Sequence, residues 1–318
     1  MPPVKCDADG NLYIRRFALN RLLGPVLKID SDGKAAGLFD PSVFASLALT
    51  RVDAFSPAPD GGIYQIAQSG IVKPRIYVLH YSSDGSASSP SRLDADLEVY
   101  TFAAFPDGNF LVSGVQRDPM EKNDHGRGVT EVFSADGREL AQLTFQAPQQ
   151  KSPKPASLEA ASGAKPGANL TNAQVQKEAP PPEPAKATDK PAGALDLKDA
   201  GISRDGNLYV MRTSSQALID VIAPGGKIMK TLKIASPLSS GRPITFHVSE
   251  NRIAVLFTNG DEQMAIAVVD GQTGRKIAGY SNPADLGSFA CYSANDGVFT
   301  FVKHGDGNVI EVIRAEAQ

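Results

Sequence analysis

Short stretches of alternating apolar and polar residues recur along the whole chain, and most of them begin at a glycine turn. Three copies read Asp9-Gly10-Asn11-Leu12-Tyr13-Ile14, Asp107-Gly108-Asn109-Phe110-Leu111-Val112 and Asp205-Gly206-Asn207-Leu208-Tyr209-Val210, and Asp60-Gly61-Gly62-Ile63-Tyr64 is a close variant. An Asp-Gly-Asn turn followed by alternating apolar residues is a strong hairpin signal, because glycine readily adopts the left-handed backbone of a tight turn. The pattern therefore predicts many short antiparallel strands.

The turn belongs to a repeat with six copies. The fifth copy, Glu250-Asn251-Arg252, has asparagine in place of the turn glycine, and the sixth is Asn295-Asp296-Gly297. Every copy is followed by a second alternating strand, which ends in its own glycine turn in five copies: Val26–Gly33, Ile76–Gly85, Val129–Gly137, Leu218–Gly226 and Ala265–Gly274. A unit of about 45 residues with four short strands is typical of a propeller blade. Six units predict an all-β, six-bladed β-propeller with four-stranded antiparallel blades.

The order of strands in a blade predicts two different faces. If strands a to d run from the central axis outward, both kinds of glycine turn, a–b and c–d, lie on one face of the disc. The b–c loops and the crossovers between blades lie on the other face, and they carry nearly all the variation in length. We call this the variable face. Variable loops on a rigid scaffold are where binding usually occurs.

The repeat divides the chain into blades one to three (4–145), an insert (146–198) and blades four to six (199–318), which together make one propeller domain. The insert is rich in proline and alanine and has no aromatic residue, so it is predicted to be disordered. The sixth copy ends before a d strand. Blade six is therefore three-stranded, unless residues upstream of Met1 or a partner strand complete it.

Composition narrows the classes of function. The chain has 318 residues, 42% hydrophobic and 21% charged, with 29 Gly, 23 Pro and a formal net charge of −3. The absence of a basic run argues against nucleic acid, and no apolar window is long enough to insert in a membrane. The N-terminal residues have neither the basic head nor the apolar run of a signal peptide. A trimmed chain or a removed export signal would explain the missing lead-in.

The repeated DGN-[LF]-[YL] turns and the following V-x-V-[FI]-x-x-x-G strands resemble those of NHL-type and related six-bladed propellers. The resemblance covers the chain outside the insert, and it implies a fold rather than an activity, since such propellers include lactonases, lyases, sensors and interaction modules. Its bacterial secreted members imply an extracytoplasmic (periplasmic or secreted) location. It also leaves open a metal-dependent hydrolase or lyase with Ca²⁺ or Zn²⁺ over the central channel.

Acidic residues near the starts of inner strands are the first candidates for such a site: Asp53, Glu98 and Asp199. They lie at unequal distances before their turns, which favours solvated strand ends over a shared metal site. His247 lies on an inner strand, and the other histidines are scattered, so no three-histidine zinc site is predicted. No catalytic residue, metal ligand or cofactor is assigned. The candidate binding residues are Asp53, Glu98, Asp199 and His247, with three from the long b–c loop of blade three: Asp124, His125 and Arg127.

The two cysteines fall on inner strands of blades one and six, which become neighbours when the ring closes. A Cys6–Cys291 disulfide would fasten that seam and close a very long loop. Against it, the two residues lie five and six positions before their turns, and inner strands can be too far apart for a bridge. Two buried thiols are the alternative.

These observations together predict a monomeric, non-enzymatic module that binds a protein or a small molecule on the variable face. The alternative is the metal-dependent enzyme of the lactonase type.

Overall fold

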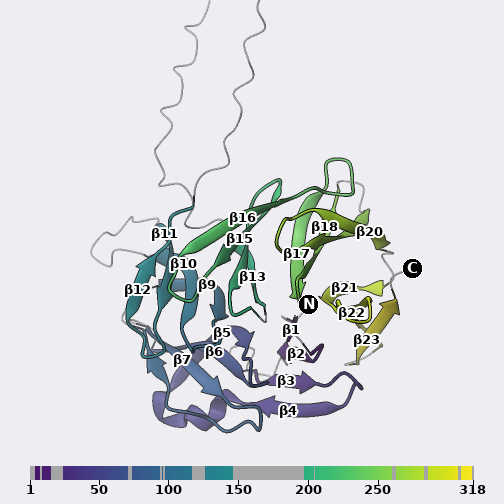
Figure 1. The fold of residues 1–318 in the computed structure, drawn as a ribbon. Helices are drawn as coiled ribbons and strands as arrows, with labels where there is room; N and C mark the ends of the chain where they lie inside the picture. The colour runs from purple at the N-terminus through teal and green to yellow at the C-terminus, as the bar shows by residue number, and fades with distance from the viewer. Residues whose placement is uncertain are drawn as a thin grey trace, which may run out of the picture.

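The computed structural model describes the whole chain except 1–3, 8, 16–23, 71–73, 94, 96, 117–125, 146–196, 204, 260–262, 283–285, 307–308 and 317–318. The described residues form six antiparallel sheets around a common centre (Figure 1). In every sheet, the strands follow one another in chain order. The structure therefore confirms the predicted six-bladed β-propeller.

The blades are built from the following strands. Blade one contains β1 (Val4–Cys6), β2 (Leu12–Arg15), β3 (Val26–Ile29) and β4 (Ala35–Phe39); blade two contains β5 (Leu49–Pro57), β6 (Ile63–Ser69), β7 (Arg75–Tyr81) and β8 (Ser91–Arg92); blade three contains β9 (Leu97–Ala104), β10 (Phe110–Gln116), β11 (Arg127–Phe133) and β12 (Glu139–Gln142). Blade four contains β13 (Leu197–Ile202), β14 (Leu208–Arg212), β15 (Ala217–Ile222) and β16 (Ile228–Ile234); blade five contains β17 (Arg242–Ser249), β18 (Arg252–Thr258), β19 (Met264–Asp270) and β20 (Lys276–Asn282); blade six contains β21 (Ser288–Tyr292), β22 (Val298–His304) and β23 (Ile310–Glu316).

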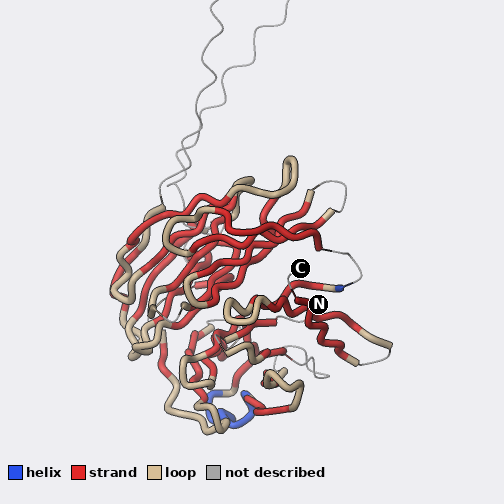
Figure 2. Tube along the Cα trace, turned by 45° about the vertical axis from the view of Figure 1, so that its right-hand side comes forward, coloured by secondary structure: helices blue, strands red, loops and turns tan. Residues whose placement is uncertain are grey.

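The first strands of the blades, β1, β5, β9, β13, β17 and β21, line the centre, and each of them contacts the first strands of both neighbouring blades. Figure 2 shows how little of the ring is helical. The 3₁₀ helix η2 (Pro41–Leu47) is part of the crossover from blade one to blade two, and the side chain of Asp40 caps its first turn by accepting a hydrogen bond from the backbone N–H of Ser42.

The glycine turns have the backbone that the sequence predicts in most copies. Gly10, Gly61, Gly108 and Gly206 all have φ between 79° and 85°. In two DGN copies the turn aspartate also accepts the backbone N–H two residues on, between Asp107 and Asn109 and between Asp205 and Asn207, both at 3.0 Å; in the first copy Asp7 accepts that N–H, from Asn11. This side-chain bond is a known reason for aspartate in turns.

The fifth and sixth turns differ from the prediction. The left-handed residue of the fifth turn is Glu250 (φ 52°) rather than Asn251, because Ser249 pairs with Arg252 and leaves a two-residue hairpin loop. A positive φ at the first of two loop residues is the geometry of a type II′ turn. In the sixth turn, Asn295-Asp296-Gly297, the left-handed residue is Gly297 (φ 72°), the third residue of the copy rather than the second as in the DGN turns.

Apolar clusters lie between neighbouring blades. Phe246, Val248 and Ile219 belong to the large cluster between blades four and five. At the seam between blades six and one, the fully buried part is small: Leu12, Ile14, Cys291 and Val302. Because apolar burial is the main favourable contribution to such interfaces, we expect the seam to be the weakest of the six.

Blade six has three strands within the described residues, as the sequence predicted for a chain without a further strand. In blade four the first strand begins at Leu197, two residues before the predicted boundary. Residues 146–196, most of the predicted insert, lie outside the described part of the chain.

Candidate binding site at the channel mouth

A pocket of about 430 Å³ opens at the centre of the ring, among residues of four inner strands. Its polar and aromatic lining comes from Lys5, Arg51, Asp53, Phe55, Tyr100, Thr101, Phe102 and Asp199. Arg51 and Asp53 are among the first residues of β5, directly after the η2 crossover. The pocket is therefore the mouth of the central channel on the variable face.

Asp53 lies on one wall of this pocket and is surrounded by donors. Its carboxylate forms an ion pair with Arg51 and accepts a hydrogen bond from Nε2 of Gln68 at 3.1 Å. Arg15, which is buried, donates to the backbone carbonyl of Asp53 at 2.7 Å. Burial raises the pKa of Asp53; Arg51 and Arg15 oppose this effect, and the nearby Glu98 adds to it.

Asp199 also lines this pocket, from β13 of blade four, and its carboxylate has more hydrogen-bond donors. It accepts hydrogen bonds from Nζ of Lys5 at 2.8 Å, from the hydroxyl of Thr245 at 2.7 Å and from its neighbouring backbone N–H, that of Ala200, at 2.9 Å. Burial acts to raise the pKa of Asp199, but these donors outweigh it and hold the pKa below its ordinary value. Asp199 is therefore a carboxylate with a built-in counterion.

A smaller cavity of about 60 Å³ adjoins this ion pair inside the channel, and His247 is part of its wall together with Lys5 and Asp199. Nδ1 of His247 is 3.1 Å from the carbonyl oxygen of Tyr292. Burial lowers the pKa of His247 to about 4, against the opposing effects of the Tyr292 bond, Asp199 and Asp7. The imidazole is thus neutral near pH 7.

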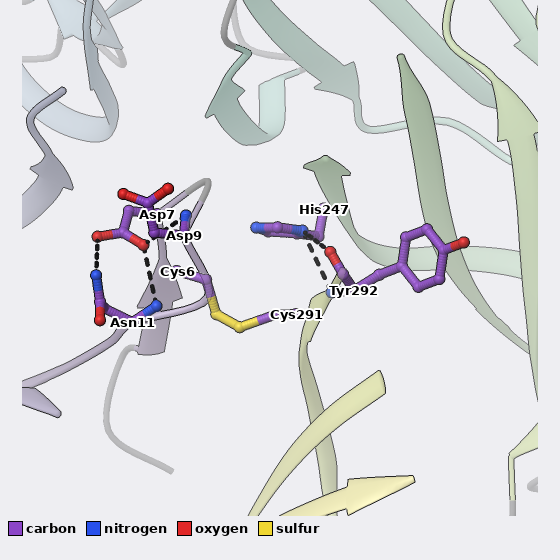
Figure 3. Close-up of a disulfide and its surroundings, with 7 residues drawn as sticks. All are labelled: Cys6, Asp7, Asp9, Asn11, His247, Cys291 and Tyr292. Carbon is purple, nitrogen blue, oxygen red and sulfur yellow. Dashed lines mark hydrogen bonds between the residues drawn. A yellow bond between two sulfur atoms is a disulfide. The ribbon is translucent and has the colours of Figure 1, made fainter. Parts of the chain in front are cut away.

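Cys6 and Cys291 are joined by a disulfide close to His247 (Figure 3). Their Cα atoms are 6.0 Å apart, within the usual range for such a bond. The concern that inner strands are too far apart does not hold here, because β1 and β21 are direct neighbours at the seam. The alternative of two buried thiols is not what the structure contains, since the described residues include no free cysteine.

The other candidates from the sequence are placed less favourably. Glu98 is half-buried on β9, opposite Val115, and is not part of the pocket wall. Arg127 is exposed at the start of β11 and donates to Oε1 of Gln116 at 2.8 Å. Asp124 and His125 lie outside the described residues. The structure therefore brings Asp53 and Asp199 into one pocket, places His247 behind it, and leaves Glu98 and Arg127 apart from it.

Sequence reasoning missed Lys5, Arg51 and Thr245. Lys5 occupies the polar middle position of the short apolar strand β1, which was the available signal. Its partner Asp199 is 194 residues away, and no local pattern links the two. Thr245 and Arg51 are polar residues on inner strands, but the sequence does not show which of these face the channel.

The opposite mouth of the channel is also hollowed. A pocket of about 230 Å³ lies among the a–b turns and includes Asp7, Asp9, Pro59, Pro106 and Ser203. Asp7 is already occupied by its own turn, because it accepts hydrogen bonds from Asn11 and from the hydroxyl of Tyr13.

Comparison with solved structures finds matches that cover most of this chain. A luciferin-regenerating enzyme matches with a TM-score of 0.50 and 11% identity, over 99% of this chain and 91% of that one. A putative TolB from Agrobacterium tumefaciens matches with 0.49 and 13%, over 88% and 81%, and the Dos1 propeller with 0.45 and 10%, over 95% and 64%. The chain thus spans less than two thirds of the Dos1 chain. At these identities the likeness shows the fold alone.

No family model matches the sequence, and no curated protein matches it. Among the described residues, no helix is long and apolar enough to cross a membrane.

Proposed function

We propose that this chain is a binding module, a propeller that resembles the NHL-type propellers, and that it binds a polar ligand or a protein segment in the pocket on the variable face. The observation that carries the proposal is the lining of that pocket. The lining contains two cations, Lys5 and Arg51, and two carboxylates, Asp53 and Asp199. It also contains Tyr100, which is 55% exposed. Exposed aromatic and arginine side chains are enriched where proteins bind partners.

The state of the carboxylates favours binding over hydrolysis. A general base or a metal site needs carboxylate oxygens that are free to act on water or a cation. Asp199 already accepts three hydrogen bonds, and Asp53 is paired with Arg51. The metal-dependent hydrolase or lyase remains the second candidate, because Asp53 and Asp199 do share one pocket.

The disulfide supports an extracytoplasmic location, because such bonds persist mainly in oxidising compartments. The acidic net charge of −3 fits neither a nucleic-acid ligand nor an anionic membrane surface. We infer a monomeric propeller domain in which the ligand enters from the variable face.

The proposal is tested with amino acids and short peptides, whose charged termini match a pocket that contains both signs of charge. Binding is measured by the shift in melting temperature and by calorimetry, on wild type and on Arg51→Ala. Lys34→Ala serves as the control, since Lys34 is exposed in a c–d turn on the opposite face. We expect a ligand of this class to stabilise wild type and Lys34→Ala, and to lose at least about tenfold in affinity with Arg51→Ala, as for one charge-assisted contact.

Two results would argue against the binding module. One is the absence of any shift with the whole ligand set. The other is tight binding of one Ca²⁺ per chain that Asp53→Asn abolishes, together with lactone hydrolysis that depends on Ca²⁺; this result would establish the enzyme instead.

A further inference from the structure

Cys6, His247 and Cys291 form a cluster with the composition of a metal site. One ligand atom from each residue lies within 4.8 Å of the other two. Among the described residues, no other three histidine, cysteine or acidic side chains come together in this way. The three residues come from inner strands of three successive blades: β17 of blade five, β21 of blade six and β1 of blade one.

We propose that reduction of the Cys6–Cys291 disulfide converts this cluster into a binding site for one Zn²⁺ ion, held by the two thiolates and the imidazole of His247. Two cysteines and one histidine are an established ligand set for zinc, with the fourth position open to water. With Zn–S bonds of about 2.3 Å and Zn–N bonds of about 2.0 Å, tetrahedral ligands are about 3.5–3.8 Å apart. The observed cluster needs only small side-chain movements to reach that spacing.

The backbone around His247 suits a metal ligand. A histidine that binds a metal through one ring nitrogen usually donates its other N–H to a carbonyl or carboxylate, which fixes the ring. The carbonyl oxygen of Tyr292 lies 3.1 Å from Nδ1 and accepts that bond when Nδ1 carries the proton; in the other tautomer Nδ1 accepts the backbone N–H of Tyr292 at 3.3 Å. Figure 3 shows that the second ring nitrogen points away from Tyr292. Nε2 is therefore the nitrogen that binds the ion, and Tyr292 orients the ring.

A small dithiol is the reductant, and it supplies all the electrons and protons that the conversion needs. The dithiol gives two electrons and two protons; the S–S bond between Cys6 and Cys291 breaks, two thiols form, and the dithiol becomes a disulfide. When Zn²⁺ binds, both S–H protons leave for solvent, two Zn–S bonds and one Zn–N bond form, and the ion with its two thiolates carries no net charge. The sulfur atoms cannot form the disulfide and bind zinc at the same time, so the two states exclude each other.

The disulfide form and the zinc form both link the two blades at the seam between blades six and one. The fully buried apolar part of the seam between blades six and one is small, and either the disulfide or the ion links β1 to β21 there. The zinc state would add a link to β17 through His247. The protein could then keep its ring closed under both oxidising and reducing conditions, by a covalent bond in the first case and by a metal in the second.

The test uses the full chain, reduced with excess dithiothreitol and exchanged anaerobically into buffer without reductant. Zn²⁺ is titrated against a chromophoric chelator, and Co²⁺ is used as a spectroscopic probe. We expect one Zn²⁺ per reduced chain, none at this affinity in the oxidised chain, release of two protons per ion near pH 7, and a thiolate-to-cobalt charge-transfer band. His247→Ala should weaken zinc binding at least about tenfold, in line with loss of one ligand.

Folding is controlled separately. His247→Ala keeps both cysteines, so its oxidised form retains the disulfide and shows by circular dichroism whether the substitution itself disturbs the fold. His80→Ala is the matched control, because His80 is outside the cluster and stacks on Tyr64. Three results would overturn the proposal: a disulfide that dithiothreitol leaves intact in the folded protein, a reduced wild type that binds no Zn²⁺, or zinc binding that persists in Cys6→Ser/Cys291→Ser.

Discussion

Nζ of Lys5 on β1 is 2.8 Å from a carboxylate oxygen of Asp199 on β13, so one ion pair spans the ring from blade one to blade four. In a ring of six, these two blades are opposite each other. The side chains are 31% and 19% exposed, and they separate the wide mouth on the variable face from the small cavity beside His247. The centre of the propeller is thus bridged by a charged pair.

Removing the cation should destabilise the protein, because Asp199 would remain in the channel without its counterion. We expect Lys5→Met to lower the free energy of unfolding by about 1–3 kcal/mol, between the values typical of exposed and of fully buried pairs. The free energy of unfolding is measured by urea denaturation, monitored by circular dichroism. Lys34→Met, on an exposed turn, is the control; equal stability of the two variants would show that the bridge contributes nothing.

The contribution of Asp199 should also depend on pH. Its folded pKa lies below the ordinary value of 3.8, so the carboxylate stabilises the folded state above the unfolded pKa. That stability is lost as the pH falls through the lower, folded value. We expect the stability difference between wild type and Asp199→Asn to be constant from about pH 7 to 5 and to shrink below about pH 4. A difference that is the same at pH 3 and pH 7 would contradict this assignment.

The seam disulfide should be a major source of stability, because it joins residues 285 positions apart. A bond that closes so long a loop removes much of the freedom of the unfolded chain. We expect Cys6→Ser/Cys291→Ser to lose about 2–5 kcal/mol of unfolding free energy. The free energies of unfolding of wild type and the double variant are compared with a zinc chelator present. In dithiothreitol, the free energy of unfolding of wild type should fall to that of the double variant.

Blade four contains a buried ion pair, and breaking it should destabilise the protein more than breaking the Lys5–Asp199 pair. Arg212 donates to both carboxylate oxygens of Asp220, at 2.6 and 2.9 Å, and Asp220 is fully buried. Arg212→Met leaves that carboxylate unpaired apart from the hydroxyl of Thr231, so we expect a loss of about 3–5 kcal/mol. Replacing both partners with apolar residues, as in Arg212→Met/Asp220→Leu, should recover most of it. A double variant as unstable as the single one would show that the pair has a further role.

Gly114 is predicted to be essential for the close pairing of β9 and β10. A Cβ atom there would lie 2.0 Å from the carbonyl oxygen of Glu98, at a bulge in the register. We therefore expect Gly114→Ala to cost about 1–3 kcal/mol. Gly225 is the matched control, because a Cβ there meets nothing within 4 Å. Gly225→Ala should be neutral or stabilising by about 0.4–1 kcal/mol.

The turns show how far sequence alone could go. Gly108 and Gly206 were predictable, because a left-handed position is a local property of two or three residues. The fifth turn was placed one residue away from Glu250, since the loop there is set by the pairing of β17 with β18 rather than by its own composition. Local chemistry thus determines the period of the fold, and pairing between strands determines the detail.

The site was less predictable, for a physical reason. Contacts across the centre depend on the radius of the ring and on the depth of each residue along its strand. The unequal distances of Asp53 and Asp199 from their turns favoured separate, solvated strand ends, yet both residues line one pocket of about 430 Å³. The bond between Cys6 and Cys291 depends in the same way on the distance across the seam, where the Cα atoms of the two cysteines are 6.0 Å apart.

The disulfide has a consequence for proteolysis. It joins residue 6 to residue 291, so every peptide bond between these two residues lies inside one covalently closed loop, including those between β12 and β13, whereas β22 and β23 lie outside it. A protease that cuts once inside the loop yields a molecule of unchanged mass apart from one added water. Its two fragments separate only after reduction, and until then the nicked ring stays a single molecule.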